Sequence, residues 1–137
     1  MRRLAPLVVL VAAVSLAAAA LAARPHETQP VVVRTTAKFG AILTTKGRLA
    51  LYTWNREKGG KVRCTGACAA TWPPLTVAAG TMVAKHVPHA MGSFGTVRRP
   101  DGRTQVTFDG HPLYTYHADT PTKILCNGVD GWFVARA

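Results

Sequence analysis

Hydrophobic and polar positions alternate along this chain in short runs separated by turn residues, a pattern typical of antiparallel β-strands. After the first 23 residues, no stretch has the three-to-four-residue apolar spacing of an amphipathic helix. We therefore expect a mainly β fold that begins near Val31. One short helical turn is predicted at 67–71, where Pro73 and Pro74 would stop it.

The strands fall into two groups. The runs 39–43 and 48–54 flank Thr44-Thr45-Lys46-Gly47 and predict a hairpin, with Gly47 supplying the positive φ of the turn. The runs 94–99, 103–108 and 112–117 are joined by turns that contain Asp-Gly, and they predict a three-stranded meander. After an irregular loop over 77–91 and a late turn at Asn127-Gly128, a closing strand is expected at 132–135.

The two groups are copies of one unit. A shift of 62 residues places Leu51–Trp54 on Leu113–Tyr116 and aligns Cys64 with Cys126. A further gap of two residues aligns Trp72 with Trp132. We predict a single small domain of two related antiparallel β units, at about 39–75 and 94–135. Each unit would cover the apolar face that the other cannot bury alone.

Each copy carries a tyrosine, a second aromatic residue two positions later and an acid three positions after that. These residues are Tyr52, Trp54 and Glu57 in the first copy, and Tyr114, Tyr116 and Asp119 in the second. Alternation along a strand places both rings on one face. We expect the rings to be buried and the acids to accept backbone N–H groups just past the strand end. A surface on which the rings stack against a ligand is the alternative.

The first 23 residues have a different composition. Arg2 and Arg3 precede an apolar run, and an alanine-rich stretch follows it, which is the three-part pattern of a signal peptide. We predict a signal-peptide helix at 1–23, a flexible lead-in at 24–30 and the β-repeat domain at 31–137. An uncleaved anchor helix is the alternative, whereas cleavage would leave no transmembrane span. Either way the domain is expected to be secreted or extracytoplasmic, in the periplasm or cell envelope.

The charge indicates the kind of partner. The formal net charge is +11, and removal of Arg2 and Arg3 leaves +9. Such a basic domain is expected to bind an anionic cell-envelope surface or polymer. The cations are dispersed and no reading element accompanies them, so no specific nucleic acid is expected. The six acids fall mostly in predicted turns. We therefore expect a non-enzymatic binding or structural module with no catalytic residue and no cofactor; the sequence leaves its oligomeric state open.

The paired motifs resemble a family of bacterial secreted and lipoprotein repeats with the pattern Tyr-x-(Phe/Trp/Tyr)-x-x-Asp, whose biochemical function is not established. The second copy matches this pattern fully, and the first has Glu57 in place of Asp. The resemblance covers nearly all of 39–134 and implies an exported repeat fold without naming a reaction. The last turn, Cys126-Asn127-Gly128, departs from the Gly-Gln-Gly of such proteins.

Three cysteines in an exported chain leave one free or paired between chains. Loop-closure entropy is worth about 2 kcal/mol for a Cys64–Cys68 bridge and about 4 kcal/mol for Cys68–Cys126. Proximity and the family resemblance nevertheless favour Cys64–Cys68. We predict this pairing, with Cys126 as a free or intermolecular thiol.

The alternative function is a small extracytoplasmic redox or copper-handling protein. His86, His89 and Met91 place two imidazoles and a thioether within one loop, and such ligands suit copper. A loop histidine beside proline is more often solvated, and the cysteines have neither thioredoxin-like nor zinc-site spacing. We therefore predict no metal site.

Overall fold

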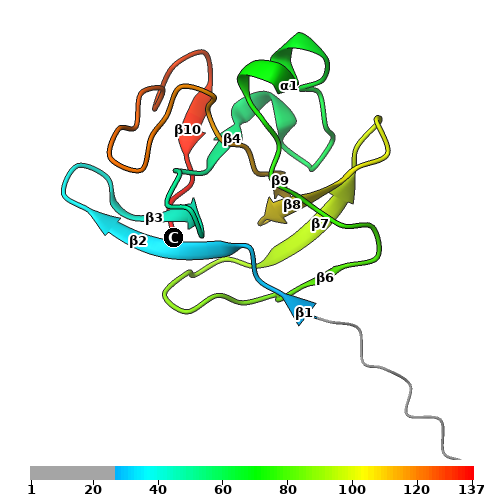
Figure 1. The fold of residues 1–137 in the computed structure, drawn as a ribbon, viewed down its shortest axis with the longest axis horizontal. Coiled ribbons are helices and arrows are strands. Elements are labelled where there is room, and N and C mark those ends of the chain that lie inside the picture. Colours follow the sequence, from blue (N-terminus) through cyan, green and yellow to red (C-terminus); the bar gives the residue numbers. More distant parts are fainter. Residues whose placement is uncertain (1–26) are drawn as a thin grey trace, which may run out of the picture.

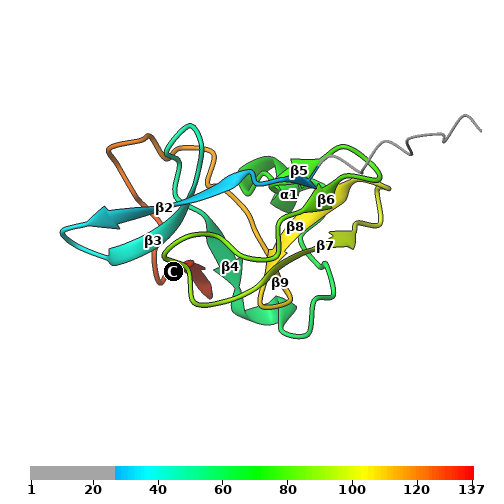
Figure 2. The same cartoon turned by 90° about the horizontal axis from the view of Figure 1, so that it is seen from below.

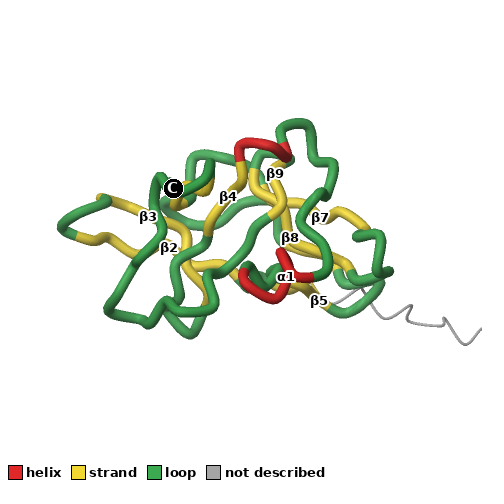
Figure 3. The backbone as a smooth tube through the Cα atoms, turned by 90° about the horizontal axis from the view of Figure 1, so that it is seen from above, coloured by secondary structure: helices red, strands yellow, loops and turns green. Residues whose placement is uncertain are grey.

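The computed structural model describes residues 27–137, and the signal peptide predicted at 1–23 lies outside them. The described residues form short strands joined by loops, with one short α-helix and one 3₁₀ turn, which Figure 3 colours red. The strands are β1 (Glu27–Thr28), β2 (Val31–Thr36), β3 (Gly40–Thr45), β4 (Tyr52–Trp54), β5 (Thr76–Val77), β6 (Met82–Val83), β7 (Phe94–Arg98), β8 (Thr104–Phe108), β9 (His111–Pro112) and β10 (Trp132–Val134). The helix α1 spans Ala67–Thr71, as predicted, and the 3₁₀ turn spans Asn55–Glu57.

Antiparallel pairing dominates the sheets. The hairpin β2–β3 lies at one end of the molecule and β7–β8 at the other, as Figures 1 and 2 both show. Strands β5 and β9 pair with the free edge of β8, and β10 pairs with β4. A parallel pairing joins β1 to β6. The mainly β prediction and the meander of β7, β8 and β9 are confirmed.

The first predicted hairpin forms only in part, because β3 has a longer pairing with β2. Strand β3 pairs along its whole length with β2, from Val31 opposite Thr45 to Thr36 opposite Gly40. The predicted pairing with the following run is short: the Thr44–Ala50 bridge is flanked by hydrogen bonds from Leu51 N–H to the Leu43 carbonyl (3.0 Å) and from Thr45 N–H to the Leu49 carbonyl (2.9 Å). Val31–Thr36 continues the apolar pattern in the chain, and it can form a complete ladder with β3.

Two smaller expectations also need correction. The positive φ in the turn after β3 belongs to Arg48 (69°) rather than to Gly47. The lead-in predicted at 24–30 contains β1, and Gln29 Nε2 donates to the Ala84 carbonyl at 2.8 Å. The folded part therefore includes residues before Val31. The loop expected at 77–91 is irregular apart from β6 and the end of β5.

The two copies exchange their closing strands. In the first copy, Ala135 N–H donates to the Leu51 carbonyl (2.8 Å), and the Ala135 carbonyl accepts from Leu43 N–H (2.9 Å). In the second copy, Leu75 makes the same two bonds with Leu113 (2.9 Å) and Val106 (2.8 Å). Each copy is therefore completed by the end of the other, which gives the domain its pseudo-twofold organisation.

Alternation along these shared strands builds two hydrophobic clusters. Ile42, Tyr52, Tyr114 and Val134 face the first cluster, whereas their neighbours Leu43, Leu51, Leu113 and Ala135 face the second. All of these residues are buried. Strands with both faces covered need apolar residues at consecutive positions, which explains Ile42-Leu43 and Val134-Ala135. The motif residues lie in and around the first cluster.

Candidate functional site

The tyrosine of each motif bonds to the acid of the other copy. Tyr52 Oη donates to Asp119 Oδ2 at 2.6 Å, and Tyr114 Oη donates to Glu57 Oε1 at 2.8 Å. All four residues are buried. The two tyrosines also exchange backbone hydrogen bonds, at 2.8 and 3.0 Å. The motif therefore joins the two copies at the pseudo-twofold axis, a pairing that the motif spacing within one copy does not reveal.

Each acid also holds the loop that follows its own motif. Glu57 Oε1 accepts the backbone N–H groups of Arg63 (2.7 Å) and Cys64 (2.9 Å). In the same way, Asp119 Oδ1 accepts the N–H of Leu125 at 2.9 Å. The acids accept backbone N–H groups as expected, but from residues six or seven positions further along the chain.

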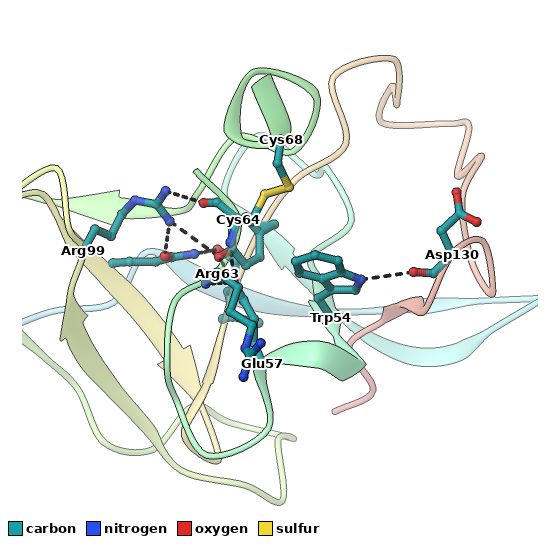
Figure 4. The surroundings of a disulfide bond; sticks show 10 residues. Trp54, Glu57, Arg63, Cys64, Cys68, Arg99 and Asp130 are labelled. Carbon is teal, nitrogen blue, oxygen red and sulfur yellow. Dashed lines mark hydrogen bonds between the residues drawn. A yellow bond between two sulfur atoms is a disulfide. The ribbon is translucent and has the colours of Figure 1, made fainter. Parts of the chain in front are cut away.

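Arg99 is buried beside one of these pairs, and Figure 4 shows its side chain pointing toward Cys64. Its Nη2 donates to the Cys64 carbonyl at 2.7 Å and its Nη1 to Gln105 Oε1 at 2.6 Å. The same Nη1 lies 3.5 Å from Tyr114 Oη. The sequence reasoning missed Arg99. The available signal was Val97-Arg98-Arg99, in which only Arg99 shares the strand face of Val97.

The environment keeps the first tyrosine of each motif, Tyr52 and Tyr114, protonated. Burial, and then the hydrogen bond to Asp119, raises the pKa of Tyr52 far above its usual value. Burial and the bond to Glu57 raise the pKa of Tyr114 in the same way. Both hydroxyls therefore act as hydrogen-bond donors near neutral pH, and each donates to a carboxylate that also carries a loop.

The remaining motif rings stack on one another. Trp72 and Trp132, the equivalent tryptophans of the two copies, are parallel with centroids 3.9 Å apart. Trp54 stacks on Trp132 at 5.0 Å, and Tyr116 lies against Trp72 at 4.8 Å. Arg56 lies over the ring of Trp54, 5.5 Å from its centroid. The rings thus form one column across the pseudo-twofold axis, and they use their faces for packing against each other.

The disulfide joins Cys64 to Cys68 across a Cα–Cα distance of 5.2 Å (Figure 4). Cys64 is buried, and its backbone is held by Glu57 on the N–H side and by Arg99 on the carbonyl side. Cys126, the counterpart of Cys64, has a free thiol within the chain and is half-buried. It lies next to Tyr116, where it raises the pKa of the Tyr116 hydroxyl.

The histidine loop lies apart from these residues. His86 and His89 are exposed, and Met91 is 94% exposed. Within residues 27–137, no group of three or more His, Cys, Asp or Glu side chains is placed to hold a metal ion. Within these residues, the imidazoles of His86 and His89 and the thioether of Met91 are therefore joined by no further His, Cys, Asp or Glu ligand.

The comparison with protein families matches residues 33–76 and 95–136 to a family described as a secreted repeat of unknown function. The chain belongs to this secreted repeat family. The two matched segments correspond to the two predicted copies, and the predicted family resemblance is confirmed. As a secreted repeat protein, it is exported from the cytoplasm, which confirms the extracytoplasmic location.

No curated protein and no solved structure matches the chain. None of the helices in the described part of this secreted repeat protein has the length and apolar character needed to cross a membrane. The family gives a location and an architecture, so the biochemical role has to be argued from the site and the surface.

Proposed function

We propose that this secreted repeat protein is a non-enzymatic binding module that attaches to anionic surfaces or polymers of the cell envelope. The observation that carries the proposal is the imbalance of accessible charge. Folding buries acids and leaves cations at the surface, so the molecule presents a more basic surface than its composition alone implies.

Residues 27–137 hold fourteen of the seventeen Lys and Arg residues and all six acids. Thirteen of these fourteen cations lie outside the buried core, but only four of the six acids do. The buried charged residues are Glu57, Asp119 and Arg99. In this part of the chain, both ion pairs involve Asp101, with Arg99 and Arg103 as partners. Most surface cations are therefore available to an external anion.

The internal bonding of the motif supports a binding or structural role over a catalytic one. Catalysis by a tyrosine or carboxylate requires that group to reach a substrate. Here Tyr52 and Tyr114 are buried and each donates to an acid, and each acid also holds backbone N–H groups. These residues stabilise the scaffold that presents the basic surface.

A co-sedimentation experiment tests the proposal with the chain from residue 24 onward. At about 50 mM salt we expect binding to vesicles rich in anionic lipid or to a polyanion such as polyphosphate, and no binding to neutral vesicles. Raising the salt to about 500 mM should release the protein, because exposed charges are screened. The triple variant Lys58→Gln/Lys61→Gln/Arg63→Gln should bind more weakly. Salt-independent binding, or equal binding to neutral vesicles, would contradict the proposal.

The same preparation tests the copper or redox alternative. Thiol titration and metal analysis should give one reactive thiol, that of Cys126, and no stoichiometric metal. Stoichiometric copper or haem would instead favour the alternative, and the variants His86→Ala and His89→Ala would then show whether the histidine loop holds the copper.

A further inference from the structure

A groove of about 440 Å³ lies between the tip of the β2–β3 hairpin and the loop that follows the second motif. The hairpin contributes Arg34, Lys38 and Phe39, and the loop contributes Lys123, Ile124 and Leu125. Figure 1 shows this loop, in orange, above the hairpin, in cyan. The hydrogen bond from Arg34 Nη1 to the Pro121 carbonyl, at 3.0 Å, connects the two sides.

The groove has an unbalanced positive charge. Its lining contains three cations and no acid. In the described part of the chain, none of these three cations forms an ion pair. Arg34 Nε is shielded from solvent and has no hydrogen-bond acceptor. Because Nε is out of reach of a ligand in the groove, an anion would contact the remaining N–H groups of Arg34, whose planar arrangement suits a phosphate or carboxylate.

The rest of the lining is apolar. Phe39 is 8% exposed, and the cations of Lys38 and Arg136 lie 5.3 and 5.5 Å from its ring centroid. Leu125, on the opposite side of the groove, is 53% exposed. Removing such apolar surface from water is favourable, at about 25 cal/mol per Å². The groove therefore offers both a charged and an apolar part to one ligand.

The second copy contains the equivalent groove, lined by Gly60, Lys61, Val62 and residues 97–100. Leu43 and Val106 take equivalent places, since each carbonyl accepts from the equivalent leucine, Leu51 or Leu113. Their partners across the hairpins are Val33 and Thr96. Three residues further along each strand, Thr36 in the first copy therefore corresponds to Arg99 in the second.

Several differences separate the two grooves; besides Thr36 against Arg99, the same alignment places Arg34 of the first groove on Val97 of the second. In the second copy Arg99 turns inward, bonds to Gln105 and the Cys64 carbonyl, and pairs with Asp101. Its charge is thus satisfied within the protein. The first-copy groove is larger, at about 440 against 370 Å³, and its lining carries three cations that form no ion pair within the described residues, whereas the second carries two, Lys61 and Arg98.

We propose that the first-copy groove binds an amphiphilic anion, a phosphate or carboxylate attached to a short apolar chain. The anion lies against Arg34 and Lys123, and the chain lies against Phe39 and Leu125. A free metabolite or an envelope lipid can present this chemistry. The site goes beyond the diffuse surface binding proposed above, because it is a single saturable site that requires the apolar part of its ligand.

Hexyl phosphate is the probe, since it stays monomeric and combines both parts. Titration into the ¹⁵N-labelled chain from residue 24 should give saturable NMR shifts confined mainly to residues 34–39 and 121–125. Inorganic phosphate at the same ionic strength should bind at least tenfold more weakly, because it lacks the chain. Shifts spread over the basic surface, or equal affinity for inorganic phosphate, would overturn the proposal.

The pseudo-symmetry supplies a matched pair of variants. Lys123 and Lys61 are equivalent and both exposed, but only Lys123 lines the first-copy groove. Lys123→Gln should weaken hexyl phosphate binding about threefold, and Arg34→Gln about tenfold, whereas Lys61→Gln should leave it unchanged. Leu125→Ser should lower the affinity for hexyl phosphate until it is close to the affinity for inorganic phosphate. Equal effects of Lys123→Gln and Lys61→Gln would contradict a defined site.

The same pair separates this site from the surface function. Diffuse binding to a polyanion should fall equally in Lys61→Gln and Lys123→Gln, so either proposal can fail alone. Vesicles containing an anionic lipid distinguish the two sources of the ligand. If Lys123→Gln weakens binding to these vesicles more than Lys61→Gln does, the ligand is a lipid headgroup. If Lys123→Gln weakens only the binding of hexyl phosphate, the ligand is a free amphiphile.

Discussion

The two buried tyrosine–acid pairs contribute to stability in a pH-dependent way. Tyr52 and Tyr114 each donate to a carboxylate inside the protein, and this arrangement raises the pKa of both hydroxyls. In the unfolded chain a tyrosine ionises near pH 10. Above that pH the folded state retains protons that the unfolded state has lost, so the free energy of unfolding falls as pH rises.

We therefore predict that stability is constant from neutral pH to about pH 9 and falls steeply above pH 10. Urea unfolding at a series of pH values measures this. The double variant Tyr52→Phe/Tyr114→Phe should lose about 2 kcal/mol per hydrogen bond at pH 7 and show a flatter alkaline decline. Tyr116→Phe is the control for the loss at pH 7, because the hydroxyls that bond to Asp119 and Glu57 belong to Tyr52 and Tyr114. An unchanged alkaline slope in the double variant would contradict the prediction.

Residue types alone could not assign these pairs. The sequence indicated that Glu57 and Asp119 accept backbone N–H groups, because an acid just after a strand commonly does so. The hydroxyl partner of each acid comes from the other copy, 57 and 67 residues away. Arg99 was missed for a related reason, since a buried arginine is rare and depends on acceptors brought from other elements.

At the scale of elements, the loop from the first motif to α1 is tied down at several points. Glu57 and Arg99 hold the backbone of Cys64 from both sides, and the disulfide links Cys64 to α1 at Cys68. The loop after the second motif has the bond from Leu125 to Asp119, and the thiol of Cys126 remains free. The two equivalent loops therefore differ in kind of constraint, since the first is also closed by a covalent bond.

We predict that replacing both disulfide cysteines, Cys64→Ser/Cys68→Ser, costs about 2 kcal/mol of stability, since the bridge closes a very short loop. The fold should persist, because the hydrogen bonds of Glu57 and Arg99 to the backbone of residue 64 remain. Thermal unfolding measured with and without a reductant checks this. Loss of the folded state in the reduced wild-type protein would show that the backbone bonds alone cannot hold the loop.

Element positions were predicted better than element partners. The helical turn at Ala67–Thr71 and the strands around 94–98, 104–108 and 132–134 lie where the local pattern indicated. The main partner of β3 was missed because β2 and the following strand offer similar apolar patterns, and only the completed ladder distinguishes them. The positive φ at Arg48 was missed because glycine is merely the residue with the lowest cost there.

At the scale of the whole molecule, the exchange of closing strands makes the two copies interdependent. Leu75 completes the second copy and Ala135 completes the first, so neither copy closes its own sheet. The column of Trp54, Trp132, Trp72 and Tyr116 also alternates between the halves of the chain, and its two central rings come one from each copy.

We predict that fragments 24–80 and 81–137 are unfolded when separate and form a folded complex when mixed. Each fragment alone exposes the apolar faces that the other covers, and small units with incomplete cores are only marginally stable. Near-ultraviolet circular dichroism reports the tryptophan stacking, and analytical ultracentrifugation gives the stoichiometry. A fragment that folds cooperatively by itself would contradict the role of strand exchange.

The sequence by itself determined the β character, the two copies and the membership of an exported repeat family. Alternation, turn residues and internal similarity are properties of neighbouring or aligned residues, so they can be read without a fold. The tertiary structure decided which tyrosine meets which acid, which strand closes each copy, and which residues line each groove. These features depend on contacts between distant segments. Thr36 and Arg99 became comparable only when the hairpins aligned in space, and that alignment allowed the larger groove to be compared with the smaller one.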